Sequence, residues 1–204
     1  MTTEQAVPVG RPTDRGTSTR SGLLAAARQV FTMEGYSQAG VTDIVALAGA
    51  SVGSLYHHFS GKADLYLTLF EEHNQEHASR TRAAVRACRS SGVTDPMQLF
   101  LAGARSYLDV CIEQRDLAGL FARGDGPPGF ELTWRDRLGD WVRMNTEFFA
   151  RSGEPLDEAA AIVMTGAMML AVAEVSLAQD TASARHLADG VLEVMSRLMV
   201  RPAT

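Results

Sequence analysis

Two histidines and a glutamate in the segment HNQEH, residues 73–77, match a pattern that binds zinc in one class of peptidases. His73 and His77 lie four residues apart, so on a helix they would share one face, as two ligands of one zinc ion must. The pattern fixes only three positions, however, and no acidic third ligand follows it in a matching context. We therefore predict no metal, no cofactor and no enzymatic activity. A zinc-dependent hydrolase built on His73, Glu76 and His77 is a remote alternative.

The same two histidines also continue a stripe that begins at Tyr66 and Phe70, at the spacing of one helix face. This stripe could face the C-terminal part of the chain and place an imidazole at the mouth of a ligand pocket. The simpler interpretation is a solvated helix face, since two glutamates lie beside the histidines. The sequence leaves both possibilities open and favours the solvated face.

The segment SVGSLYHHFSGKADL, residues 51–65, contains the only lysine of the chain, whereas every other basic residue is arginine. Lys62 opens a helical pattern, although the partial positive charge of a helix N-terminus disfavours a cation. A helix N-terminus binds anions, and a lysine beside it would strengthen such a site. This placement predicts that Lys62 binds a phosphate.

The helical pattern just before Lys62 has two contrasting faces. Val52, Leu55 and Phe59 cluster on one side of a helical wheel and predict a buried face, with Tyr56 beside them. The opposite side carries only small or hydrogen-bonding residues, namely Gly53, Ser54, His57 and His58. Small residues allow close approach to a DNA major groove, and hydroxyl or imidazole groups can contact base edges or phosphates. A DNA-reading helix and a helix that merely caps a small core both fit this pattern.

The elements that would position these residues are all helical, because apolar residues recur at helical spacing and no convincing alternating strand pattern occurs. Residues 1–17 are rich in Pro, Gly, Thr and Arg and predict a disordered arm. Residues 18–62 predict a three-helix domain, in which a helix-turn-helix spans about 40–59 with glycine at its corner. Residues 63–204 hold the remaining helices. We expect an all-α protein with roughly nine helices.

The cysteine content and the apolar stretches of the sequence indicate the cellular location. The two cysteines, Cys88 and Cys111, fit neither a disulfide framework nor a zinc cluster, so a reducing cytoplasm is the simplest location. Residues 159–173 carry no charge, but the stretch is short for a membrane span and has an acid at each end. We expect a helix buried in protein and no membrane association.

The charge distribution permits a nucleic-acid partner despite a net charge of −5. The acidic excess lies in the part of the chain after residue 62, while the first part is close to neutral. The predicted helix-turn-helix is therefore free to approach phosphates.

The segments LLAAARQVFTMEGY and VTDIVALAGASVGSLYHHFSGKADL together resemble the N-terminal domain of the TetR family of transcriptional regulators. The shared features are an alanine-rich helix ending in Phe and Gly-Tyr, Asp-Ile in the second helix, Ala-Gly before the turn, and Gly-x-Leu-Tyr-x-x-Phe followed by a lysine. The resemblance covers about residues 20–65. It implies a homodimeric repressor that a small molecule releases from a double-stranded DNA operator.

By position, the resemblance implies DNA contacts from the region of the third helix. His57, the most outward position, is a candidate base reader, and Lys62 would bind phosphate. Gly40 stands where many members have a threonine that caps the second helix and touches phosphate, so Thr42 is expected to supply that hydroxyl. The remaining contacts implied are Ser51, Gly53, Ser54, Tyr56 and His58. With few charged contacts, DNA binding should depend only weakly on salt.

The helices after residue 62 carry aromatic and methionine stripes that suit either a core or an adaptable apolar pocket. We expect an apolar or aromatic effector in a pocket lined by Phe70, His73, Phe100, Tyr107, Cys111, Trp134, Trp141, Met144, Phe148, Met164 and Met168.

The last two predicted helices, about 156–179 and 182–200, are apolar over wide faces. Two such helices from each of two copies would form a four-helix dimer interface, predicted to contain Met169, Val172, Leu187, Val191, Val194 and Leu198. A regulator without any effector, whose C-terminal half serves only dimerisation, remains a second alternative.

Overall fold

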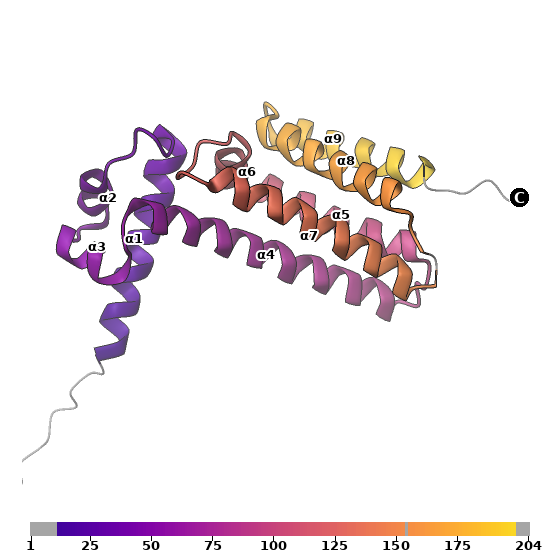
Figure 1. Ribbon diagram of the computed structural model, residues 1–204, viewed down its shortest axis with the longest axis horizontal. Helices are drawn as coiled ribbons and strands as arrows, with labels where there is room; N and C mark the ends of the chain where they lie inside the picture. Colours follow the sequence, from indigo (N-terminus) through magenta and orange to yellow (C-terminus); the bar gives the residue numbers. More distant parts are fainter. Residues whose placement is uncertain (1–11, 154, 199–204) are drawn as a thin grey trace, which may run out of the picture. The chain divides into compact units, whose positions relative to one another are not determined.

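The computed structural model describes residues 12–153 and 155–198, and all regular secondary structure within them is helical. Figure 1 shows the nine helices of this described part, and the predicted all-α fold is confirmed. They are α1 (Pro12–Glu34), α2 (Val41–Ala48), α3 (Val52–His58), α4 (Lys62–Ser90), α5 (Pro96–Glu113), α6 (Arg115–Ala122), α7 (Phe130–Arg151), α8 (Glu158–Leu177) and α9 (Thr181–Leu198).

The chain divides into two compact units, Met1–Leu67 and Thr68–Thr204. The helix α4 contributes its first residues to the N-terminal unit and the rest to the C-terminal unit. The sequence placed a domain boundary at residue 62, where α4 begins, whereas the compact units divide inside the helix.

Helix α1 begins earlier than the sequence predicted. The disordered arm was expected to reach residue 17, but residues 12–17 are helical. Pro12 is the first helical residue, a position that proline favours because its fixed φ suits a helix and its missing N–H is not needed there. The rest of the predicted arm, residues 1–11, lies outside the described residues.

The N-terminal unit is built around a small apolar core from α1, α2, α3 and the start of α4. Leu23, Phe31, Ile44, Leu55 and Leu65 are completely buried. Their spacing along each helix places them on one face, so each short helix is held by the apolar surface it buries rather than by its own propensity.

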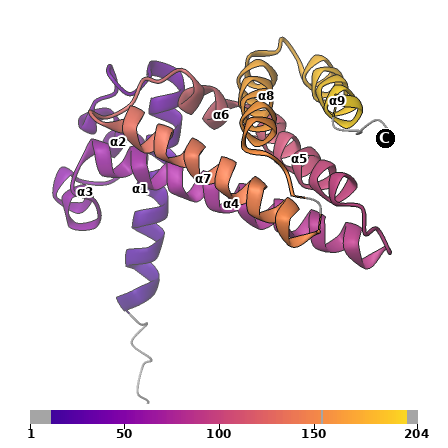
Figure 2. The same ribbon diagram turned by 45° about the vertical axis from the view of Figure 1, so that its right-hand side comes forward.

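In the C-terminal unit, α8 packs against α6, α7 and α9, and α5 packs against both α8 and α9. Figure 2 shows α8 beside α9 within this unit. Its core centres on Leu108, Val175, Ala184 and Ala188, all fully buried. Gly103 of α5 lets α4 approach closely, because a Cβ atom there would lie 3.1 Å from Val85.

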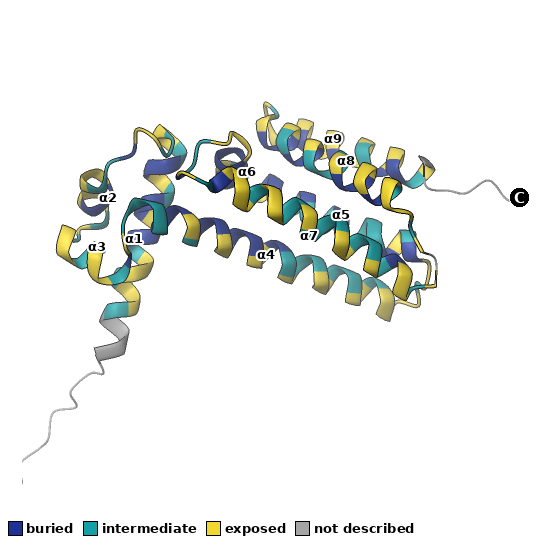
Figure 3. Cartoon of the chain, in the orientation of Figure 1, coloured by how far each residue is buried: buried dark blue, intermediate teal, exposed yellow. Residues whose placement is uncertain are grey.

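Helix α8 is long and apolar enough to cross a membrane, but only by length and composition. The core helix of a soluble protein passes the same test, and several residues of α8 are buried in the C-terminal unit. Figure 3 shows that α8 also carries exposed residues along its length. The exposed apolar ones are Ile162, Val163, Leu170 and Leu177.

Candidate DNA interface and ligand cavity

The α2–α3 corner is a tight helix-turn-helix. Gly49 adopts a left-handed conformation (φ 62°, ψ 30°) and ends α2, and its N–H donates to the Ala46 carbonyl. Glycine enters this region without the steric cost of a side chain. Two residues later the Ser51 hydroxyl accepts a hydrogen bond from the Ser54 N–H at 3.0 Å and caps α3. The turn is therefore fixed by local backbone chemistry.

Helix α3 buries Leu55 and leaves its opposite side accessible. Ser51, Gly53 and His57 are exposed, and the Tyr56 side chain is 57% exposed. Ser54 and His58 are half-buried, and the rings of His57 and His58 lie 4.9 Å apart. The accessible side thus presents hydroxyl and imidazole groups with little bulk, which suits contact with base edges.

Val52 departs from its predicted burial, because its side chain is 44% exposed. It is the first residue of α3, just after the Ser51 cap, and it lies a turn before Leu55, which enters the core. The helical wheel placed Val52 on the correct side of α3 but carried no information on where the core ends along the helix axis.

At the start of α2, the absence of a side chain at Gly40 has a local cause. A Cβ atom there would lie 2.3 Å from a carboxylate oxygen of Asp43. Gly40 provides no side-chain cap, and Thr42 is exposed in the first turn of α2. Thr42 therefore presents a hydroxyl close to the α2 N-terminus, and its contact with phosphate stays a prediction.

Lys62 has a structural role that the sequence did not reveal. Its ammonium donates hydrogen bonds to the backbone carbonyls of Tyr36 at 2.8 Å and Ala39 at 2.9 Å. The ammonium also lies 4.4 Å from the centre of the Tyr36 ring, a cation–π contact. Lys62 thus ties the α1–α2 connection to the start of α4. Two carbonyls hold the ammonium that was predicted to bind phosphate.

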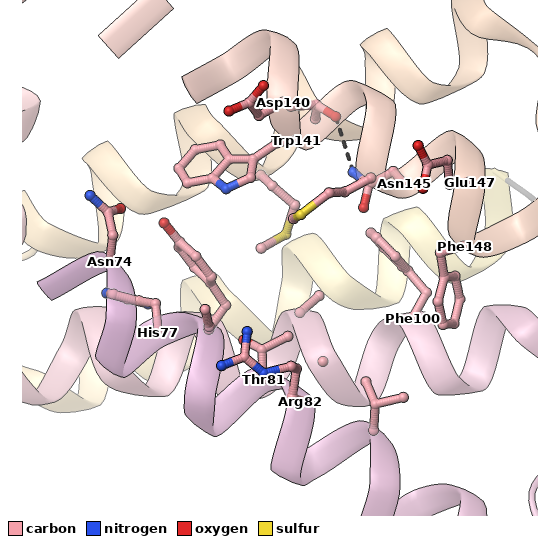
Figure 4. A pocket seen from close by; sticks show the side chains of 18 of the residues that line it. Asn74, His77, Thr81, Arg82, Phe100, Asp140, Trp141, Asn145, Glu147 and Phe148 are labelled. Atoms are coloured by element: carbon pink, nitrogen blue, oxygen red, sulfur yellow. Dashed lines mark hydrogen bonds between the residues drawn. The ribbon is translucent and has the colours of Figure 1, made fainter. Parts of the chain in front are cut away.

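A cavity of about 930 Å³ lies in the C-terminal unit among α4, α5, α7 and α8. This volume falls in the range of sites for small organic ligands. Figure 4 shows His77 and Thr81 of α4 across the cavity from Trp141 and Asn145 of α7. The lining is mostly apolar and includes Phe100, Tyr107, Trp141, Met144, Phe148, Met168, Met169 and Val172.

Charged side chains also line the cavity. Arg137 forms an ion pair with Glu71 at 2.9 Å, and Arg151 forms one with Glu147 at 2.7 Å. Three further arginines, Arg82, Arg86 and Arg89, lie along one side of α4 and are exposed.

The histidine pair is buried, so the favoured expectation of a solvated face is wrong. His77 is 1% exposed, and its Nε2 atom lies 3.1 Å from Nε2 of His73. His73 Nδ1 lies 2.9 Å from the amide oxygen of Gln114, which joins α5 to α6. The Tyr107 ring is close to the His77 ring, with centroids 4.1 Å apart.

Burial is the largest cause that lowers the pKa of His77 to about 3, and electrostatic interactions with His73 and Arg80 contribute in the same direction. Burial also raises the pKa of the Cys111 thiol to about 12. At neutral pH both groups are therefore uncharged. Glu76, the acidic residue of the zinc pattern, is exposed. Among the described residues, no three histidine, cysteine, aspartate or glutamate side chains are placed to hold a metal ion.

The family model of "Bacterial regulatory proteins, tetR family" matches residues 23–69, which run from the middle of α1 into α4. Over these residues the chain is similar to the DNA-binding domain of TetR-family regulators. The predicted resemblance is confirmed.

The curated relatives match less than half of the chain. The transcriptional activator FasR of Mycolicibacterium smegmatis is 38% identical over 90 residues, which are 44% of this chain and 39% of that protein. The transcriptional repressor BepR of Brucella suis is 39% identical over 51 residues, 25% of this chain and 24% of that protein. The chain thus spans less than half the length of these curated relatives. Both are transcriptional regulators, in line with the prediction of no enzymatic activity.

Solved structures of the TetR family share the fold over nearly the whole chain. A TetR-family regulator from Syntrophomonas wolfei has a TM-score of 0.74 at 18% identity, covering 92% of this chain and 98% of that one. FadR from Bacillus subtilis, in complex with stearoyl-CoA, has a TM-score of 0.68 at 19% identity, covering 86% and 96%. At such identities these likenesses establish the fold of both units.

Within this TetR-family fold, the predicted pocket residues separate into two groups. Phe100, Tyr107, Trp141, Met144, Phe148 and Met168 line the cavity. The others do not. Phe70 and Trp134 pack with Phe121 and Phe130 in an aromatic cluster. His73 lies behind His77, and Cys111 and Met164 are buried in the core.

This difference has a geometric cause. A stripe of aromatic residues identifies the side of a helix that faces the interior. Both the core and the cavity wall lie on that side, so the stripe does not tell them apart. Asn74, Thr81, Asn145 and Thr165 line the cavity and were missed as pocket residues, and His77, which also lines it, was considered only as the less favoured alternative. The spacing of His77 with His73 was the one sequence signal for this part of the wall.

The predicted dimer residues also separate. Leu187 and Val194 are exposed on α9. Val172 is buried and Val191 packs against the core, while Met169 and Val172 line the cavity. The side chain of Leu198 lies outside the described residues. The exposed apolar residues of α8 were missed because the helix is apolar on all sides, so its sequence does not distinguish the inner face from the outer one.

Proposed function

We propose that this protein is a homodimeric transcriptional regulator that binds a double-stranded DNA operator through α3, and that a small-molecule effector in the cavity releases it. The accessible side of α3 is the observation that carries the proposal. It presents Ser51, Ser54, Tyr56 and His57 on a helix whose other side is anchored by Leu55. This is the arrangement of a recognition helix in a major groove.

The proposed contacts divide by chemistry. His57 and Ser54 read base edges, and Gly53 permits close approach of α3 to the groove. Tyr56, Ser51, His58 and Thr42 contact the sugar-phosphate backbone, which sets the register without reading sequence. Lys62 acts mainly by holding the α1–α2 connection in place, because its ammonium already donates to two carbonyls.

The exposed apolar side of α8 and α9 supports the proposed dimer. Val163, Leu170 and Leu177 are spaced seven residues apart on α8, and Leu187 and Val194 have the same spacing on α9. Each of these side chains is more than one third exposed. Apolar stripes of this kind mark protein–protein interfaces. A second copy that contributes the same two helices would form a two-fold four-helix interface.

The effector acts through α4 in this proposal. This helix contributes residues to the DNA-binding unit and lines the cavity with Asn74, His77 and Thr81. A ligand that favours one position of α4 would move the two α3 helices out of register with successive major grooves. A coupling of about 1–3 kcal/mol would change operator affinity roughly 5- to 150-fold. FadR, a fold relative, is known in complex with stearoyl-CoA, which supports an effector with a large apolar part.

Selection of bound DNA from a random pool tests the DNA-binding part of the proposal. We expect a palindromic site whose half-sites are about one helical turn, or a multiple of it, apart. Tyr56→Ala should then weaken binding of that site in gel shifts, while size exclusion finds the dimer intact. Met33→Ala is the matched control, because Met33 is 83% exposed on α1 and lies outside α3. Equal operator affinity of the wild type and Tyr56→Ala would refute the assignment.

A regulator without an effector is the second candidate, since a C-terminal unit can serve dimerisation alone. The size of the cavity favours an effector. Thermal unfolding across a metabolite library separates the two candidates, because a specific ligand raises the melting temperature. Repression is the proposed direction of control, and cytoplasm the proposed location. A reporter gene behind the selected operator should be silenced by the protein, and activation of that reporter would reverse the direction.

A further inference from the structure

Two polar atoms at the cavity have no hydrogen-bond partner among the described residues. They are Nδ1 of His77 and the hydroxyl oxygen of Thr81, both buried. The two residues lie one turn apart on α4, where residues at this spacing have Cβ atoms about 5–6 Å apart on the same side. Buried polar atoms are nearly always paired, so an unpaired one at a cavity wall indicates a place for a ligand group.

The protonation of His77 is set by a chain of hydrogen bonds behind it. The Gln114 amide oxygen can only accept a hydrogen bond. His73 Nδ1 must therefore carry the proton and donate it to that oxygen. A neutral His73 then has a lone pair on Nε2. His77 Nε2, at 3.1 Å from that atom, must donate. The remaining ring nitrogen, His77 Nδ1, is left as an acceptor.

We propose that the cavity selects neutral ligands that carry a hydroxyl group on an apolar body, and that His77 Nδ1 accepts the hydrogen bond from that hydroxyl. This inference rests on the proposed effector-binding function. The apolar body would lie against Trp141, Phe100 and Met168, which line the same cavity. The hydroxyl end of the ligand would lie at His77, whose acceptor atom is fixed by the hydrogen bonds from His77 to His73 and from His73 to Gln114.

Thr81 completes the recognition of a hydroxyl. Its side chain can donate as well as accept, so a ligand hydroxyl can receive a hydrogen bond from Thr81 while it donates to His77. Beside His77, a carboxylate or an ether oxygen fits poorly, because neither can donate to Nδ1. Burial and neighbouring charges keep the pKa of His77 well below neutrality, so the ring is neutral at pH 7. A neutral ring can accept the hydrogen bond from a ligand hydroxyl.

Binding of matched small molecules to the full-length dimer, without DNA, tests the proposal. Calorimetry compares 2-naphthol with 2-methoxynaphthalene and 2-naphthoate, and 1-dodecanol with methyl dodecyl ether and dodecanoate. We expect at least one alcohol or phenol to bind about tenfold tighter than its ether and its acid. His77→Phe and Thr81→Val should each reduce that preference. Thr146→Val is the control, because Thr146 donates to the Val142 carbonyl and does not line the cavity.

Substitution of Gln114, which does not line the cavity, tests the direction of the hydrogen bonds from His77 to His73 and from His73 to Gln114. Gln114→Lys can only donate to His73, so every hydrogen bond in the chain reverses and His77 Nδ1 becomes a donor. The ether should then bind about as tightly as the alcohol, because both oxygens can accept a hydrogen bond from Nδ1. Gln114→Met removes the anchor and should abolish the preference. Gln75→Lys is the control, because Gln75 is exposed on α4 and bonds only Glu71.

The outcomes separate this inference from the proposed function. Failure of all hydroxyl probes to bind, or ethers or acids that bind as tightly as alcohols to the wild type, would overturn the assignment of His77. Gel shifts with the selected operator are measured on the same variants. Normal operator binding with no hydroxyl preference rejects only the inference, whereas loss of operator binding by the wild type rejects the proposed function.

Discussion

The two units differ in where they place polar groups. In the N-terminal unit the surface of α3 is polar, and the half-buried Lys62 ammonium is satisfied by two carbonyls. In the C-terminal unit, α8 exposes apolar residues, and the cavity wall contains polar atoms without partners. The polar surface of α3 suits a hydrated, charged duplex. An apolar surface and an unfinished interior suit a second copy of the chain and a ligand.

The largest expected effect comes from placing a charge on the apolar surface of α8. Leu170→Glu should weaken the dimer by roughly 4 kcal/mol or more, because two copies of the carboxylate would be desolvated at the interface. Light scattering after size exclusion measures it as a shift to monomer. Leu132→Glu is the control, since Leu132 is similarly exposed on α7. A dimer that survives Leu170→Glu would remove this surface from the proposed interface.

Lys62→Met tests whether the lysine belongs to the interior of the N-terminal unit. It should lower the free energy of unfolding by roughly 2–3 kcal/mol, because the Tyr36 and Ala39 carbonyls lose a charged donor. Urea denaturation followed by circular dichroism measures the loss. If Lys62 served only as a phosphate ligand, stability would stay unchanged and only DNA affinity would fall.

The same contrast explains what the sequence could predict. The helix-turn-helix depends on short-range patterns, such as Gly49 at the turn, Ser51 at the cap and Leu55 one turn later, so its position could be predicted from neighbouring residues. The pairing of Lys62 with Tyr36 and of His73 with Gln114 joins residues 26 and 41 positions apart. Such contacts depend on how helices pack, and no local pattern encodes them.

His77 should make stability depend on pH between about 3 and 6.5. Its pKa is lowered from 6.5 to about 3 in the folded chain, so the unfolded chain binds the proton more readily in this range. Stability is full above pH 6.5 and falls as the pH falls toward 3. Between pH 6.5 and 5 the loss from this group is roughly 2 kcal/mol.

Urea denaturation at pH 7 and pH 5 measures the effect of this histidine, with His77→Phe as the comparison. His73, Arg80, Tyr107 and Cys111 surround the ring and remain in both proteins. The variant should lose less stability on acidification than the wild type. An equal loss in the two proteins would mean that the folded chain does not lower the pKa of His77, so the ring would be protonated at pH 5 and could not accept a hydrogen bond at that pH.

The smallest effect concerns Val52, where burial was predicted and exposure is found. Val52→Ala should change the free energy of unfolding by less than about 0.5 kcal/mol, because an exposed side chain contributes little to the core. Leu55→Ala, one turn later and completely buried, should cost about 2–5 kcal/mol. Denaturation of both variants compares the two positions directly. A large loss for Val52→Ala would mean that the core extends to the start of α3, and the side of α3 available for DNA would be narrower than proposed.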